Sequence, residues 1–334
     1  MAVSDLVNRP PTIRDVAARA GVSHQTVSRV INDNPQVTPA TRERVLAAIR
    51  ELSFVPSPLA RGLLSNQTRS IGVVADDISD HFFARMVAGA EAEARRRGYY
   101  LMIGSVEPDE DEAGYLRLML ERRVEALVLA RPSAPLSADA LTAGVPLVAV
   151  GSFAHTEVPV VDVDNRQGGY DATRYLLERG HRRIATIVGP AGWPSAVARL
   201  DGYCDAVHEA GVDELVERAS DWGLEGGFAA ASRLLERGAE FTALFAHSDL
   251  IALGAIRRLR EVGLRVPEDV SVVGYDDLPV ADYVEPALTT VHQPMREVGA
   301  LAVGLLLDQL GGAPPLPPAA HLLPAKLIVR QSVT

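Results

Sequence analysis

The chain has 334 residues, of which 47% are hydrophobic and 23% charged, a composition typical of a globular protein with two or three domains. No apolar run approaches the roughly 20 residues that cross a bilayer, and the N-terminus lacks the apolar segment of a secretory signal. Cys204 is the single cysteine, which excludes an intramolecular disulfide. We therefore expect a cytoplasmic protein.

The net charge of −10 is unevenly distributed. Residues 1–70 contain nine arginines and five acidic residues, a net charge of +4, so the rest of the chain carries −14. A basic segment can approach phosphate, whereas an acidic one is repelled by it. The distribution indicates a head that binds nucleic acid, although charge alone is as compatible with a chance fluctuation.

Residues 12–32 have the pattern of two short helices joined by a tight turn. Thr12 is a suitable N-cap, and Gly21 ends the first helix because glycine readily adopts a positive φ. Ser23 then caps the second helix. Apolar residues recur at helical spacing in both segments: Ile13, Val16, Ala17 and Ala20, then Val27, Val30 and Ile31. The pattern predicts a helix-turn-helix.

A third helix is predicted to begin after Thr38, with Pro39 at its first position and an apolar face of Val45, Ile49 and Leu52. Any small three-helix bundle has such faces, so the polar face of the second helix is the informative feature. It presents His24, Gln25, Ser28 and Arg29. Glutamine can pair with adenine, arginine with guanine, and hydroxyls with phosphate. We therefore predict that this helix enters a major groove.

From Ser70 onward, short apolar runs alternate with longer helical stretches. Strands are predicted at 71–75, 100–105, 126–130 and 147–150, and a second series at 184–188, 243–246 and 270–274. Helices are predicted between them, for example at 84–97, 168–178, 224–236 and 250–262. This alternation predicts two lobes, each a parallel sheet covered by helices. Ligands bind beyond the carboxyl ends of such strands, so the expected site lies between the lobes.

Polar and aromatic residues follow several of these strands. Carboxylates, arginine and glutamine can bond to sugar hydroxyls, and an aromatic ring can stack on the apolar face of a sugar. For each residue the alternative is a helix cap or a loop ion pair, and Asp249 is a strong case because it could cap the helix near Leu250. The candidate ligand residues are Asp76, Asp80, Phe82, Ser195, Arg199, Trp222, Ser248, Asp249, Asp276 and Gln293.

The sequence contains no phosphate-binding G-x-x-x-x-G-K-[ST] motif, no metal-binding H-E-x-x-H or C-x-x-C motif and no catalytic G-x-S-x-G motif. The histidines at 181 and 247 lack a ligand partner at metal spacing and are interpreted as structural. We therefore expect neither an enzyme nor a bound cofactor or metal.

The stretch TIRDVAARAGVSHQTVSRVINDNPQVTPATRERVLAAIRELSFVPSPLARGLLS resembles the DNA-binding head of the LacI/GalR family of bacterial transcription regulators. The resemblance implies that His24, Gln25 and Arg29 read bases. It also implies a hinge helix that folds on DNA, with Leu63 wedged between base pairs; the alternative is a flexible linker, because so short a helix is unstable alone. Further expected DNA-binding residues are Thr12, Thr26, Ser28, Asn32, Ala60 and Arg61.

The rest of the chain resembles the core of the same family, which is itself similar to periplasmic sugar-binding proteins. Matching stretches include VDNRQGGYDATRYLLERGHRRIATIVGP, HSDLIALGAIRRL and VPEDVSVVGYDD. The resemblance implies sugar contacts for Ser195, Arg199, Trp222, Asp276 and Gln293. Asp76, Asp80 and Ser248 depart from the family's pattern, which implies a different or larger sugar.

These observations predict an all-α helix-turn-helix domain followed by an α/β core of two Rossmann-like lobes. The expected bounds are 1–56 for the DNA-binding domain, 57–69 for the hinge and linker, and 70–334 for the ligand-binding and dimerisation core. Within the core, the first lobe is expected at 70–162 and 293–322 and the second at 163–292 and 323–334.

The expected function is that of a repressor of carbohydrate-utilisation genes, released from operator DNA by a sugar. The chain shows no C-terminal heptad helix of the kind that makes tetramers in this family, so a homodimer is expected. The alternatives left open are a non-sugar or co-repressor ligand, and a sugar-binding protein with no DNA function.

Overall fold

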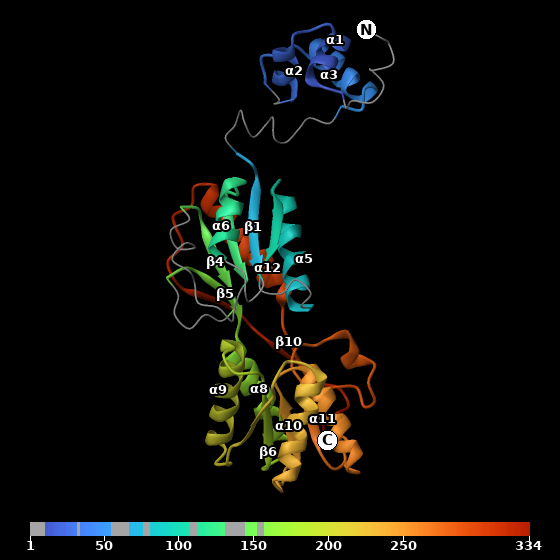
Figure 1. Cartoon of the computed structure of the whole chain (residues 1–334), viewed down its shortest axis with the longest axis vertical. Coiled ribbons are helices and arrows are strands. Elements are labelled where there is room, and N and C mark those ends of the chain that lie inside the picture. The colour runs from blue at the N-terminus through green and yellow to red at the C-terminus, as the bar shows by residue number, and fades with distance from the viewer. Residues whose placement is uncertain are drawn as a thin grey trace. The chain divides into compact units, whose positions relative to one another are not determined.

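The computed structural model describes residues 11–31, 34–54, 67–75, 81–106, 112–130, 144–151 and 157–334. The chain forms two compact units, residues 1–68 and 69–334, whose helices and strands are shown in Figure 1. Within the described residues, no helix is long and apolar enough to span a membrane.

In the part of the N-terminal unit that the structure describes, the helices are α1 (Ile13–Ala20), α2 (His24–Ile31) and α3 (Pro39–Glu51). The predicted caps are confirmed. The backbone nitrogen and the hydroxyl of Thr12 both donate to Asp15 Oδ2, and each distance is 2.7 Å. Gly21 ends α1 with φ 65°. The Ser23 hydroxyl accepts from the Thr26 backbone N–H at 3.1 Å. The buried core of this unit consists of Val16, Ala17, Ala20, Val27, Val30, Val45 and Ala48.

The first lobe of the core is built on a six-stranded parallel sheet, in the order β11-β5-β4-β3-β1-β2. Its strands are β1 (Ser70–Ala75), β2 (Tyr100–Ser105), β3 (Ala126–Ala130), β4 (Leu147–Val150), β5 (Val160–Val163) and β11 (Ala320–Leu323). The helices of this lobe that fall within the described residues are α5 (His81–Arg96), α6 (Glu112–Glu121) and α12 (Met295–Leu310). Alternate strand residues point to opposite faces, so Val73 packs with α5 and α12 while Val74 packs with α6.

The second lobe contains a four-stranded parallel sheet in the order β7-β6-β8-β9. Its strands are β6 (Ile184–Val188), β7 (Leu215–Arg218), β8 (Ala243–Ala246) and β9 (Ser271–Val273). The helices α8 (Asn165–Glu178) and α9 (Pro194–Glu209) cover one face, and α10 (Leu224–Glu236) and α11 (Asp249–Glu261) cover the other. The predicted two-lobed α/β fold is therefore confirmed.

Within residues 157–334 the chain passes between the two sheets at three places. They lie between β5 and α8, between β10 (Thr290–His292) and α12, and between β11 and β12 (Lys326–Ile328). The strands β10 and β12 form an antiparallel pair beside the second lobe, and Figure 1 shows the chain running through this region between the lobes. Residues on these connections can therefore contact groups of both lobes.

Several predicted bounds differ from the structure. The helix expected from residue 84 begins at His81, and the helix expected from 168 begins at Asn165 because Asp164 accepts from the Gln167 N–H at 2.9 Å. The strand expected at 270–274 is confined to Ser271–Val273. The helix expected near Leu250 begins at Asp249, so its cap lies one residue earlier than predicted.

Candidate functional site

The polar face of α2 is the candidate DNA surface of the N-terminal unit. His24, Gln25 and Arg29 are exposed, whereas Val27 and Val30 are 0% and 2% exposed. The buried valines fix the orientation of the helix, so its polar side chains point to solvent and are free to meet base edges. Of the other expected contacts, Thr26 and Ser28 are half-buried and Thr12 caps α1; Asn32, Ala60, Arg61 and Leu63 lie outside the described residues.

In the core, Arg199 is the centre of a buried polar cluster. It is 4% exposed. Its Nε donates to Asn165 Oδ1 at 2.9 Å and its Nη1 to the His247 carbonyl at 2.5 Å. The same Nη1 lies 3.7 Å from Asp276 Oδ1, which also accepts from Gln293 Nε2 at 2.8 Å. A buried charge is costly unless it is paired and hydrogen-bonded, so these groups depend on one another.

Aromatic rings flank the guanidinium of Arg199. Its central carbon lies 3.7 Å from the ring centroid of Tyr275 and 5.5 Å from that of Trp222. Trp222 packs so closely over Gly189 that a Cβ on this glycine would lie 2.3 Å from the indole. Ser248 donates from its hydroxyl to the Trp222 carbonyl at 3.0 Å and caps α11 by accepting from the Ile251 N–H at 3.0 Å. Four of the predicted ligand residues, Arg199, Trp222, Asp276 and Gln293, thus lie together.

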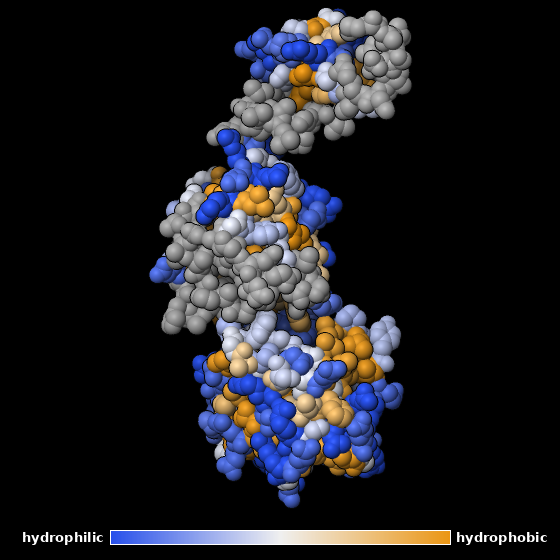
Figure 2. Space-filling view, in the orientation of Figure 1, coloured by the Kyte–Doolittle hydropathy of each residue, from blue (hydrophilic) through white to orange (hydrophobic). Residues whose placement is uncertain are grey.

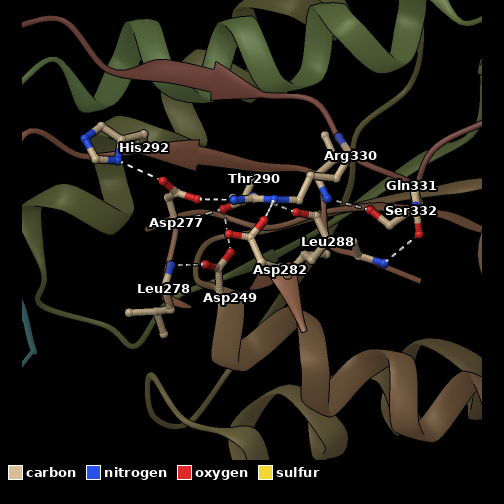
Figure 3. A network of polar contacts seen from close by, with 12 residues as sticks. Asp249, Asp277, Leu278, Asp282, Leu288, Thr290, His292, Arg330, Gln331 and Ser332 are labelled. Carbon is tan, nitrogen blue, oxygen red and sulfur yellow. Dashed lines mark hydrogen bonds and ion pairs between the residues drawn. The ribbon is translucent and has the colours of Figure 1, made fainter. Parts of the chain in front are cut away.

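Asp249 belongs to a different network, drawn in Figure 3. Its Oδ2 accepts from the Leu278 N–H at 2.7 Å and its Oδ1 from the Thr290 hydroxyl at 2.5 Å. The prediction that Asp249 caps α11 is wrong, because Ser248 is the N-cap. Burial raises the pKa of Asp249 to about 7, although the hydrogen bonds from Thr290 and Leu278 act in the opposite direction. Both carboxylate oxygens are therefore engaged in holding the second lobe together.

Figure 3 also shows Asp277 between the side chains of His292 and Arg330. Its Oδ2 lies 3.0 Å from His292 Nδ1 and its Oδ1 2.7 Å from Arg330 Nη2. Burial alone would raise the pKa of Asp277, but the hydrogen bonds from Arg330 and His292 hold it below the usual value. Asp276 and Asp277 both have positive φ, 117° and 56°. With this backbone, the Asp276 side chain points toward Gln293 and the Asp277 side chain toward His292. The turn after β9 therefore contacts the segment between β10 and α12, which leads to the first lobe.

Asn165 was not predicted as a site residue, yet it joins the two lobes. It is 3% exposed. Its Nδ2 donates to the Val163 carbonyl at 3.1 Å and to Asp162 Oδ2 at 3.4 Å, and its Oδ1 accepts from Arg199. Val163 ends β5 of the first lobe, whereas Arg199 lies on α9 of the second. The only sequence signal was its place in a stretch that matches the family.

The remaining candidates contribute less to this cluster. Ser195 is half-buried in the first turn of α9, and Phe82 is half-buried on α5, edge-on to His81 with ring centroids 5.9 Å apart. Asp76 and Asp80 lie outside the described residues. In the part of the chain that the structure describes, no group of three or more His, Cys, Asp or Glu side chains could hold a metal ion.

Known protein families match both units. Residues 12–57 match the family of bacterial regulatory proteins named lacI, and residues 173–333 match a periplasmic binding protein-like domain. The chain is 41% identical over 337 residues to the HTH-type transcriptional regulator CelR of Thermobifida fusca, covering 97% of this chain and 98% of CelR.

Two solved structures are also similar. The lac repressor dimer bound to operator and the anti-inducer ONPF has a TM-score of 0.88 and 33% identity, with 97% of this chain and 99% of that chain covered. A CelR–cellobiose complex has a TM-score of 0.72 and 38% identity, with coverage of 96% and 99%. The similarity thus spans the helix-turn-helix and the two-lobed core together. The chain belongs to the LacI family and is a DNA-binding transcription regulator rather than an enzyme.

Proposed function

We propose that this protein is a homodimeric repressor of carbohydrate-utilisation genes, and that a sugar bound at the Arg199 cluster releases it from its operator. The carrying observation is the convergence of Arg199, Asp276 and Gln293, which are 4%, 4% and 6% exposed, beside Trp222. Guanidinium, carboxylate and amide groups bond to sugar hydroxyls, and an indole stacks on the apolar face of a sugar ring. The structure of a CelR relative with cellobiose supports the ligand class.

The proposed contacts divide between the two units. In the N-terminal unit, bases are read by His24, Gln25 and Arg29, with Leu63 inserted at the centre of the operator. In the core, the proposed sugar contacts are Ser195, Arg199, Trp222, Asp276 and Gln293, with Phe82, Asp76 and Asp80 from the first lobe. Ser248 and Asp249 are proposed to support this site, because their polar atoms already bond within the second lobe.

The proposed mechanism is a linkage between operator binding and sugar binding. A ligand shifts an equilibrium only through its different affinities for the two states. Arg199 belongs to the second lobe and is bonded to Asn165, which is bonded to the end of β5 in the first lobe. A sugar that takes hydrogen bonds from Arg199 therefore competes with a contact that joins the lobes, and the lobes in turn hold the two hinges of a dimer.

A dimer is part of the proposal because operator half-sites are read by paired heads. The related lac repressor was solved as a dimer on its operator. Figure 2 shows hydrophobic residues gathered on part of the surface of the second lobe, and large hydrophobic residues exposed on that lobe include Leu224, Val280 and Tyr283. The proposed location is the cytoplasm, where the operator lies.

The test is to select an operator from random DNA with the full-length protein and then titrate sugars into the complex. Fluorescence anisotropy of labelled operator measures release. We expect at least one sugar to weaken operator binding by about 5- to 150-fold, the usual range of allosteric coupling. If a sugar tightens binding, the ligand acts as a co-repressor; if sugars bind the protein but leave operator affinity unchanged, the induction mechanism is refuted.

A further inference from the structure

The chain has two tryptophans, and the fold brings them together. Trp193 and Trp222 are 29 positions apart in the sequence, yet their ring centroids lie 5.8 Å apart with planes at 88°. Trp222 follows β7 and Trp193 follows β6, neighbouring strands of a parallel sheet, so both indoles stand at the carboxyl edge of that sheet. Trp222 is also the indole beside Arg199.

Trp193 is held by a rigid turn. Gly192 has φ 86°, and Pro194 begins α9 directly after Trp193. The Trp193 carbonyl accepts from the Ala196 and Val197 N–H groups at 3.0 and 3.2 Å. The backbone is thus fixed while the side chain stays half-buried. Trp222 packs against the core of the second lobe, whereas Trp193 is not among the side chains of that described core.

We infer that Trp193 is the stacking platform for a second sugar ring, so the effector is a saccharide of at least two rings. This inference rests on the sugar-effector function proposed above. A flat ring stacks against one plane at a time, and these two planes are nearly perpendicular. The ring whose hydroxyls reach Arg199 and Asp276 lies against Trp222. The second sugar ring, which is linked to the first, then stacks on the plane of Trp193. Stacking adds affinity there and needs few polar contacts.

Trp193 and Trp222 are the two tryptophans of the chain, and both lie at the proposed sugar site. Intrinsic fluorescence of the full-length protein therefore reports directly on sugar binding there. The probes are matched pairs of one-ring and two-ring sugars: glucose and cellobiose, galactose and lactose, xylose and xylobiose. Each is titrated into the natural protein and into Trp193→Ala and Trp193→Phe. Phenylalanine keeps a stacking plane and is the matched control, while Trp222 remains as the fluorophore in both variants.

We expect one disaccharide to bind about tenfold more tightly than its monosaccharide, a gain within reach of one aromatic contact. Trp193→Ala should remove that difference and leave the monosaccharide Kd within about twofold, and Trp193→Phe should restore most of the gain. Equal weakening of both sugars would show that Trp193 only supports Trp222, and an unchanged disaccharide Kd would also overturn the inference. If none of the six sugars binds, the sugar-effector proposal is contradicted together with this inference; if sugars bind but Trp193 has no selective effect, only this inference is contradicted.

Discussion

Replacing Asp249 by asparagine tests the ionisation of the network in Figure 3. The side chain is 0% exposed and its pKa is raised from 3.8 to about 7, mainly by burial. Asparagine has the same shape. Its oxygen can accept from the Leu278 N–H and its amide can donate to the Thr290 hydroxyl, so both contacts of the carboxylate have a replacement.

The raised pKa of Asp249 makes the folded protein less stable as the pH rises. A folded-state pKa above the unfolded value means that the folded protein holds a proton that the unfolded chain has lost. The stability associated with this proton is fully present below pH 3.8 and is lost as the pH rises through about 7. Between pH 3.8 and about 7, each pH unit lowers the free energy of unfolding by about 1.4 kcal/mol, so the whole range amounts to a loss of about 4 kcal/mol.

The assay is urea unfolding of the natural protein and Asp249→Asn at pH 5, 6, 7 and 8, followed by tryptophan fluorescence. The difference in free energy of unfolding should shift in favour of the variant by about 1.4 kcal/mol per pH unit from pH 5 to 7 and then level off. Asp269→Asn is the matched control. Hydrogen bonds from Arg265 lower the pKa of Asp269 to about 2. The difference in free energy of unfolding between the natural protein and Asp269→Asn should therefore not change from pH 5 to 8. A flat difference for Asp249→Asn as well would show that this carboxyl is ionised throughout, and would refute the reasoning.

Three further substitutions probe the proposed contacts. Gln25→Ala should lose about 1–3 kcal/mol of binding free energy at one operator position, measured by anisotropy on operator variants. A uniform loss of affinity over all sequences would indicate a phosphate contact instead. Gln36→Ala, an exposed residue of the same unit, is the control. Asp276→Asn removes the charge that faces Arg199 and should weaken sugar binding at least about tenfold in calorimetry, whereas abolished operator binding would show that Asp276 holds the fold. Gly189→Ala places a methyl group 2.3 Å from the indole of Trp222 and should reduce sugar affinity at unchanged operator affinity; sugar binding that matches the natural protein would argue against the stacking role.

Much of the N-terminal unit was predictable because its determinants are local. The caps at Thr12, Ser23 and Thr38 bond to residues three positions away, and Gly21 ends α1 within the same segment. The strands at 100–105, 126–130, 147–150, 184–188 and 243–246 were predicted with the bounds they have in the structure. Buried parallel strands are short apolar runs, and such runs are visible without knowing their neighbours.

The grouping of candidate residues was predictable only through the resemblance to a family. Residue types can suggest sugar contacts, but Asp249 and Asp276 look alike in sequence. The structure separates them: Asp276 faces Arg199 and Gln293, while Asp249 bonds to Leu278 and Thr290. Ser248 is the N-cap of α11 because its hydroxyl accepts a hydrogen bond from the Ile251 N–H.

By itself, the sequence determined the helix-turn-helix, the alternation of strands and helices and the separation of a basic head from an acidic body, since each depends on neighbouring residues or on composition. Only the tertiary structure decided that Asn165 bridges the lobes to Arg199, that Trp193 meets Trp222, and that Asp277 lies between His292 and Arg330. Asp277 and Arg330 are 53 residues apart. Such pairs form because the strand order β7-β6-β8-β9 and the connections between the lobes bring distant segments to one edge of the sheet, and that order is not encoded in any short stretch of the chain.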